Sequence, residues 1–99
     1  MAVSVSFIKA AKQDIDQAYS WYELRQVNLG DRFLNEAEQT LQLIKASPKA
    51  FPRKYRFIRV KLLNIFPYAL FYNIEDKGNV RIYACLYLRR NLSQILKNR

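Results

Sequence analysis

The spacing of apolar residues changes from a strand period to a helix period near the start of the chain. Residues 3–7 alternate strictly between apolar and polar, which predicts a short, half-buried strand. From 9 to 27 the apolar residues recur every three or four positions, which predicts an amphipathic helix. The stripe consists of Ala11, Ile15, Ala18 and Tyr22.

A second helix is predicted to follow after a short break. The segment 28–30, Asn-Leu-Gly, contains residues that tolerate positive φ, and Asp31 then places negative charge where a helix dipole favours it. Helical spacing continues to about residue 46, and Pro48 disfavours further helix. The apolar stripe of this helix is Phe33, Ala37, Leu41 and Ile44. The two helices form a predicted helical hairpin.

After Pro52 the chain returns to strand-like alternation. Residues 55–62 predict a strand that buries Ile58, Val60 and Leu62. Two further strands follow, separated by turns at 64–67 and 75–79, and they span 68–74 and 80–86. Because the connections are short, these three strands should form an antiparallel meander.

The element order therefore predicts an α+β fold, a two-layer β-α-α-β-β-β sandwich. The helical hairpin would pack on a mainly antiparallel sheet of four strands. Residues 92–97 predict a last short helix that would be marginal unless it docks. A chain of 99 residues suffices for one compact core, so residues 1–99 are expected to form a single domain.

The start of the chain and the lack of a membrane-length apolar segment indicate a soluble, cytoplasmic protein. No basic stretch leads into a long apolar run near Met1, and no segment approaches the roughly 18 apolar residues of a membrane helix. Cys85 has no second cysteine to pair with, and its place within an apolar strand predicts a small core residue.

Charge is distributed unevenly between the two halves of the chain. Residues 1–48 hold five basic and six acidic side chains, whereas residues 49–99 hold twelve basic and two acidic ones. The second half therefore has a charge of +10 and the first half a charge of −1, which together give the net charge of +9. Such a field favours an anionic partner, either nucleic acid or an acidic protein segment. A solvated basic surface kept for solubility is the alternative.

Missing residue types exclude several kinds of chemistry. With no histidine, the chain lacks the usual neutral-pH base and the commonest transition-metal ligand, so triads and histidine metal sites are excluded. Its two glycines cannot form a glycine-rich phosphate loop. Asp14 and Asp16 should point to different sides of a helix, and residues 75–76 lie in a turn. We expect no metal and no cofactor.

The remaining candidates are arginines and tyrosines near the C-terminal strands. Alternation in the strand 80–86 predicts one face with Arg81, Tyr83, Cys85 and Tyr87, and a core face with Val80, Ile82, Ala84 and Leu86. Guanidinium groups can hold phosphates or carboxylates, and tyrosines can stack on bases. Cross-strand tyrosine–arginine pairs that need no ligand are the structural alternative. The candidate binding residues are Arg59, Arg81, Tyr87, Arg89 and Arg90.

Several short motifs in order give the chain a resemblance to a known family. The segment 66–72, Phe-Pro-Tyr-Ala-Leu-Phe-Tyr, precedes a strand that ends in Leu-Tyr-Leu-Arg-Arg at 86–90. Upstream motifs are Asp14-Ile15, Trp21-Tyr22-Glu23, Gly30-Asp31-Arg32-Phe33, and Ile44 followed by Pro48 and Phe51. In this order and spacing the chain resembles the RelE/ParE toxins of type II toxin–antitoxin systems, and the ParE branch in particular.

The resemblance implies one of two targets. RelE-like toxins cut messenger RNA in the ribosome, whereas ParE-like toxins, often linked to plasmid stabilization, poison DNA gyrase. Ala69 replaces the arginine that RelE-like toxins carry after the strand-opening tyrosine, which favours the ParE branch. Tyr87 stands where histidine is frequent, and Asn91-Leu92 replaces a common Asp-Pro. We therefore expect a gyrase inhibitor that acts by binding through the candidate arginines, and not an enzyme.

The resemblance also implies a small antitoxin, whose acidic C-terminal segment would cover the basic face and contact Trp21 and Tyr22. Two alternatives stay open. A metal-independent endoribonuclease acting on ribosome-bound mRNA would use Lys54, Lys61 or Tyr87 as its base. The other alternative is a toxin-like fold that is not toxic and serves as an interaction module.

Overall fold

The computed structural model describes residues 3–99, and their order of elements confirms the α+β prediction. The elements are β1 (Val5–Phe7), α1 (Lys9–Arg25), α2 (Leu29–Ala46), a 3-10 turn (Pro48–Ala50), β2 (Arg53–Tyr55), β3 (Ile58–Leu62), β4 (Tyr68–Ile74), a second 3-10 turn (Asp76–Gly78), β5 (Val80–Tyr87) and α3 (Leu92–Lys97). The strands form one sheet in the order β1-β5-β4-β3-β2. Only the β1–β5 pair is parallel.

The sheet has five strands instead of the predicted four, because the predicted strand 55–62 is divided by a tight turn. Tyr55 pairs with Ile58, so Arg56 and Phe57 form a two-residue hairpin loop between β2 and β3. Arg56 has φ 52°, which reverses the chain direction and ends the strand. The prediction of one continuous strand over 55–62 was therefore wrong at residues 56–57, where the chain turns.

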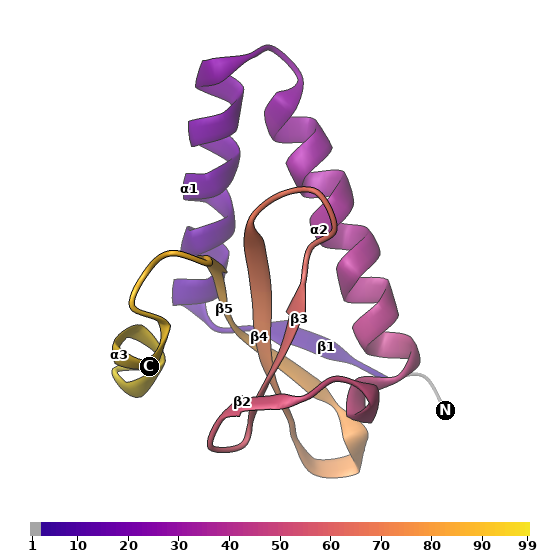
Figure 1. Ribbon diagram of the computed structural model, residues 1–99. Coiled ribbons are helices and arrows are strands. Elements are labelled where there is room, and N and C mark those ends of the chain that lie inside the picture. The colour runs from indigo at the N-terminus through magenta and orange to yellow at the C-terminus, as the bar shows by residue number, and fades with distance from the viewer. Residues whose placement is uncertain (1–2) are drawn as a thin grey trace.

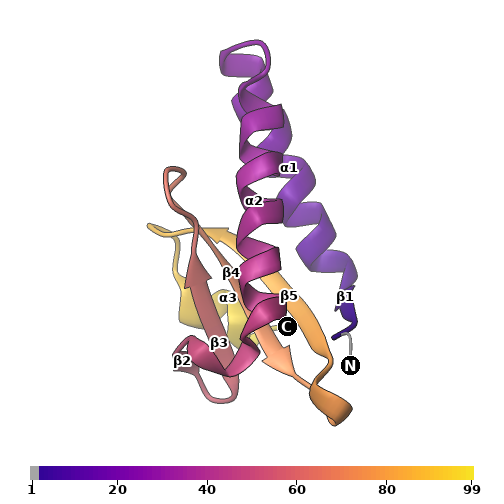
Figure 2. The same ribbon diagram turned by 90° about the vertical axis from the view of Figure 1, so that its right-hand side faces the viewer.

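Helices cover both faces of this sheet (Figure 1 and Figure 2). The α1–α2 hairpin and one sheet face enclose the larger core, which contains Phe33, Ile44 and Tyr72. The short helix α3 docks on the opposite face, where Leu96 joins a second core with Ile58 and Val60. Docking explains how so short a helix is stable, since its apolar face is buried.

Leu62 does not take the core position that alternation predicts. Its side chain is 49% exposed, and it lies outside the α3-side core that includes Ile58 and Val60. The next residue, Leu63, is buried against the helical hairpin instead, and its N–H bonds the carbonyl of Tyr68. The prediction was wrong because Leu62, the last residue of β3, pairs in register with Ala69 but lies beyond the part of the strand that the α3-side core covers.

A bulge in β5 overturns the predicted division of its side chains between two faces. Ile82 pairs with Tyr72 and Ala84 pairs with Phe71, so Tyr83 is an extra residue between the two pairs. Beyond this bulge the alternation is inverted. Cys85 therefore joins Val80 and Ile82 in the core under the helical hairpin, while Ala84 and Leu86 join the core under α3. Cys85 is a buried free cysteine, as predicted.

The turn between the helices also departs from the prediction in one respect. Asn28 has the expected positive φ, at 73°, but Gly30 lies inside α2 with helical geometry. A Cβ on Gly30 would lie 2.8 Å from both the ring and the carbonyl oxygen of Tyr19, so glycine permits the close approach of α1 and α2. Glu23 accepts hydrogen bonds from the N–H groups of Asn28 and Gly30 and thereby caps α2.

None of the helices formed by residues 3–99 combines the length and apolar character needed to cross a membrane.

Candidate functional site

A cavity of about 540 Å³ opens between α1 and the end of the β4–β5 hairpin, and we call it the aromatic cavity. Its lining comes from three places in the sequence: α1, the start of β4 and the end of β5. The lining residues are Asp14, Gln17, Ala18, Trp21, Tyr22, Pro67, Tyr68, Cys85, Tyr87 and Arg90. Four of the binding residues predicted from the sequence therefore border one cavity: Trp21 and Tyr22 on α1, Tyr87 at the end of β5 and Arg90 after it.

Tyr22 is the fixed centre of the aromatic wall. Its ring lies 4.8 Å from that of Phe66 and 5.5 Å from that of Phe33, both of which are buried. Tyr68 lies 6.0 Å from Tyr22 and 5.7 Å from Tyr87, so the rings extend from the core to the rim of the cavity. Tyr22 meets Phe66 and Tyr68 edge to face and is stacked on Phe33, and Tyr68 is tilted against Tyr87. These contacts fix the orientation of the rings in the wall.

Trp21 behaves differently from its neighbour, because half of its side chain is exposed. Its ring makes an edge contact with Tyr22 at 5.1 Å, and the guanidinium of Arg25 lies 3.8 Å over it. An exposed tryptophan held between an aromatic ring and a cation has a defined orientation without being part of the core. Such residues are typical anchors of protein interfaces.

Tyr22, Tyr68 and Cys85, which line the aromatic cavity, remain protonated at neutral pH. Burial raises the pKa of Tyr22 and of Tyr68, and in Tyr68 the charge of Arg90 opposes this rise only in part. Burial, together with the charge of Asp14, raises the pKa of the Cys85 thiol to about 12. These groups can donate hydrogen bonds, but they cannot serve as bases or as a thiolate nucleophile.

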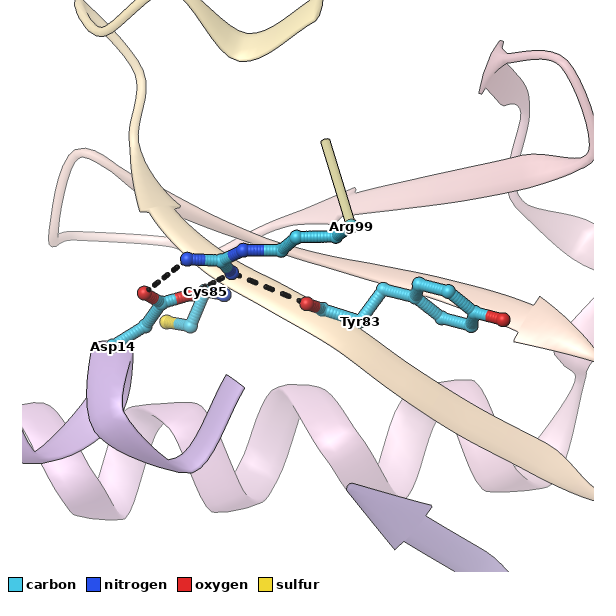
Figure 3. A network of polar contacts seen from close by, with 4 residues as sticks. All are labelled: Asp14, Tyr83, Cys85 and Arg99. Atoms are coloured by element: carbon cyan, nitrogen blue, oxygen red, sulfur yellow. Dashed lines mark hydrogen bonds and ion pairs between the residues drawn. The ribbon is translucent and has the colours of Figure 1, made fainter. Parts of the chain in front are cut away.

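Asp14, which lines the cavity, forms an ion pair with Arg99 (Figure 3). The Asp14 carboxylate also accepts the backbone N–H of Cys85 at 3.0 Å, and Arg99 donates to the carbonyl of Tyr83 at 3.2 Å. β1 ends at Phe7, so beyond Ile82 the edge of β5 has no partner strand. Asp14 and Arg99 thus bond the Cys85 N–H and the Tyr83 carbonyl, the backbone groups that a neighbouring strand would otherwise have bonded.

Sequence reasoning missed this network. It assigned Asp14 to a face of α1 away from the apolar stripe, whereas the side chain is buried beside that stripe, and it gave Arg99 no role. The two residues are 85 positions apart, so only the three-dimensional fold brings them together. The one available signal was the position of Asp14, three residues after Ala11 and four before Ala18, which is a spacing that places it next to the apolar stripe.

The other candidate arginines do not line the aromatic cavity. Arg59, on β3, donates its guanidinium to the carbonyls of Phe51, at 2.7 Å, and Lys49, at 3.2 Å. Arg81 is half-buried near the start of β5, opposite Ser6 and Asn73. Arg89 is exposed in the turn after β5, adjacent in sequence to Arg90. The predicted set is therefore divided among three places.

Across residues 3–99, no three histidine, cysteine, aspartate or glutamate side chains come close enough together to hold a metal ion.

Comparisons with known proteins agree with this architecture. Residues 5–92 match the family described as "ParE toxin of type II toxin-antitoxin system, parDE". Among solved structures, a chain of "Chromosomal ParDE TA system from P. aeruginosa" is similar in fold, with a TM-score of 0.75 at 12% sequence identity. The match covers 89% of this chain and 98% of that chain. A search of curated proteins returns no significant match.

Proposed function

The chain belongs to the ParE toxin family of type II toxin–antitoxin systems, and from that membership we propose that it inhibits DNA gyrase by binding and is neutralised by a cognate antitoxin. In this proposal residues 1–99 are one toxin domain that acts in the cytoplasm. Gyrase, or gyrase in complex with DNA, is engaged by the basic residues after β5. The antitoxin is a small protein with an acidic segment.

The observation that carries the proposal is the meeting of Trp21 and Tyr22 with Tyr87 and Arg90 around the aromatic cavity. The cavity combines apolar rings with one guanidinium at its rim, which suits a segment that carries both apolar side chains and a carboxylate. An antitoxin segment seated there would cover Tyr87 and Arg90 as well as Trp21. Neutralisation would then be direct, because the antitoxin and the target compete for the same residues.

The state of the cavity's ionisable groups supports binding over catalysis. A ribonuclease needs a base and a positioned cation at the scissile phosphate. Tyr22, Tyr68 and Cys85 remain protonated, since burial raises their pKa values. Asp14 already accepts bonds from Arg99 and the Cys85 N–H. The groups of this cavity are therefore suited to recognition.

Induced expression tests the proposal in growing cells. The wild-type chain should stop growth, and the double variant Arg89→Ala/Arg90→Ala should not, although its far-UV circular dichroism is unchanged. The matched control is Lys9→Ala/Lys12→Ala, which removes the same charge from two exposed positions of α1 and should remain toxic. Toxicity retained in the arginine variant would refute the proposed surface. Fragmented messenger RNA on induction would instead favour a ribonuclease. Normal growth on induction of the wild-type chain would favour a non-toxic interaction module.

A further inference from the structure

The tip of the β2–β3 hairpin presents an arginine where the backbone favours glycine. The loop contains two residues, and its first residue, Arg56, has φ 52°. A two-residue hairpin loop with positive φ at its first position is of the type that usually has glycine there. A long charged side chain at such a position is held at a cost in backbone strain, and strain of this kind is concentrated at functional sites. The next residue, Phe57, is 52% exposed.

Beside this tip a second cavity, of about 370 Å³, separates the hairpin from α3, and we call it the hairpin groove. Its lining combines three aromatic rings with three cations: Tyr55, Phe57, Tyr83, Arg56, Lys97 and Arg99. α3 docks on the sheet face opposite the α1–α2 hairpin (Figure 2), and no residue lines both the groove and the aromatic cavity.

Within the part of the chain that the structure describes, two of these cations, Arg56 and Lys97, have no carboxylate partner, whereas Arg99 is paired with Asp14. Among residues 3–99, the one ion pair shorter than 4.0 Å joins Asp14 to Arg99, so neither Arg56 nor Lys97 is neutralised by direct contact. The Arg56 guanidinium lies 5.6 Å over the ring of Tyr55, and its side chain makes no hydrogen bond with any other residue between 3 and 99, so its N–H groups are available to a ligand. Arg53 and Lys54 of β2 are exposed next to the groove and add to its positive potential.

We propose that the hairpin groove binds single-stranded nucleic acid, with a base stacked on Phe57 and the flanking phosphates held by Arg56 and Lys97. Aromatic rings bind any base through its π face, and cations beside them follow the backbone, which is the usual design of sites for single strands. A duplex can bind only the cations of the groove through its phosphates, because its bases are stacked on one another and cannot stack on Phe57. DNA and RNA single strands share this chemistry. The proposal stands apart from gyrase inhibition, since it concerns another face of the sheet.

The test is fluorescence anisotropy with the purified full chain and three labelled probes of about 15 nucleotides per strand, a length matched to such sites. The probes are oligothymidylate, oligouridylate and a mixed-sequence DNA duplex. At about 0.1 M salt, where long-range charge effects are largely screened, the single strands should bind at least about fivefold more tightly than the duplex. The ratio of DNA to RNA affinity identifies which single strand the groove prefers.

Two variants separate the groove from the general positive charge of the chain. Phe57→Ala should weaken single-strand binding by at least about fivefold and leave duplex binding unchanged. Arg56→Gly should weaken it by a similar factor while raising the melting temperature, because glycine relieves the positive φ. Lys77→Gly is the matched control, since Lys77 also has positive φ, at 63°, and lies outside the groove. It removes the same charge and should change single-strand affinity less than about twofold.

Three results would overturn the proposal. These are equal affinity for duplex and single strands, wild-type affinity in both Phe57→Ala and Arg56→Gly, and an effect of Lys77→Gly as large as that of Arg56→Gly. The first and third would show that binding reflects net charge alone, and the second would show that binding occurs outside the groove. None depends on gyrase, so failure here leaves the proposed inhibition untouched.

Discussion

Asp14 of α1 and Arg99, which follows α3, meet at the unpaired edge of β5 and bond the backbone there in place of a neighbouring strand. This pair links elements on opposite faces of the sheet, since α1 belongs to one core and α3 to the other. Asp14 also lines the aromatic cavity. The same contact therefore holds both the C-terminal segment and one of the cavity's lining residues in place.

Replacing either residue of this pair should destabilise the chain, and replacing Asp14 should destabilise it more than replacing Arg99. Asp14→Ala leaves the Cys85 N–H without its acceptor as well as Arg99 without its partner, so it should cost about 3 kcal/mol. Arg99→Gln should cost about 1–2 kcal/mol, because its side chain is partly exposed. Urea denaturation of both single variants and the double variant measures the coupling, which should be about 1–2 kcal/mol. Strictly additive effects would show that the pair contributes nothing.

Gly30→Ala should be more damaging than Gly78→Ala, although alanine is the better helix former. A Cβ at Gly30 would lie 2.8 Å from the carbonyl oxygen of Tyr19, so α1 and α2 must separate at a cost of about 2–3 kcal/mol. Gly78 has open space around it and only a φ of +79° to oppose a side chain, so its replacement should cost about 1 kcal/mol. Thermal denaturation measures both. The reverse order would mean that the helices separate easily.

Tyr72→Phe should destabilise the chain at neutral pH, and less so at high pH. The buried hydroxyl donates to the carbonyl of Pro48 at 2.6 Å, and its loss should cost about 1 kcal/mol. Burial raises the Tyr72 pKa above its ordinary value of 10.0, although Arg59 opposes this. A raised pKa means that the stabilisation is complete below pH 10 and is lost as the pH rises towards the folded-state value.

The measurement is urea denaturation of wild type and Tyr72→Phe at pH 7 and pH 11. The difference in unfolding free energy should narrow at pH 11. Tyr83→Phe is the control at pH 7, because the Tyr83 hydroxyl makes no hydrogen bond with any other residue between 3 and 99, and it should lie within about 0.5 kcal/mol of wild type. A constant difference between the two pH values would contradict the assigned role of the hydroxyl.

Trp21→Ala should weaken antitoxin binding by at least about tenfold without unfolding the chain, because the ring is an exposed, oriented anchor at the cavity rim. Leu24→Ala is the matched control, since Leu24 lies in the same helix, is 84% exposed and does not line the cavity. Isothermal titration with the protein encoded beside the toxin gives both affinities. Equal losses in the two variants would place the antitoxin on the outer face of α1 instead.

The hydrophobic pattern was sufficient to predict the fold class, both long helices and the strands β4 and β5. Its errors occur where the backbone breaks the two-residue period. The turn at Arg56 added a strand, and the extra residue Tyr83 moved Cys85 to the other face of the sheet. Neither change has a glycine or proline to mark it, so no local signal distinguished these positions from continuous strand.

The candidate site was predicted in part, for a related reason. The sequence identified individual candidate residues such as Trp21 and Arg90 by their chemical type. It did not predict that they border one cavity. Arg59 looked like a free cation in the sequence, whereas its guanidinium is bonded to two backbone carbonyls. Whether an arginine is occupied or available depends on contacts between distant segments, and periodicity carries no information about those.

A supercoiling and DNA-cleavage assay of purified gyrase tests the central claim most directly. The wild-type chain should abolish supercoiling or accumulate cleaved DNA, and the antitoxin should reverse the effect. Arg89→Ala/Arg90→Ala should be inactive at concentrations where Lys9→Ala/Lys12→Ala acts like wild type. Normal gyrase activity at several times the enzyme's concentration of folded toxin would contradict the account.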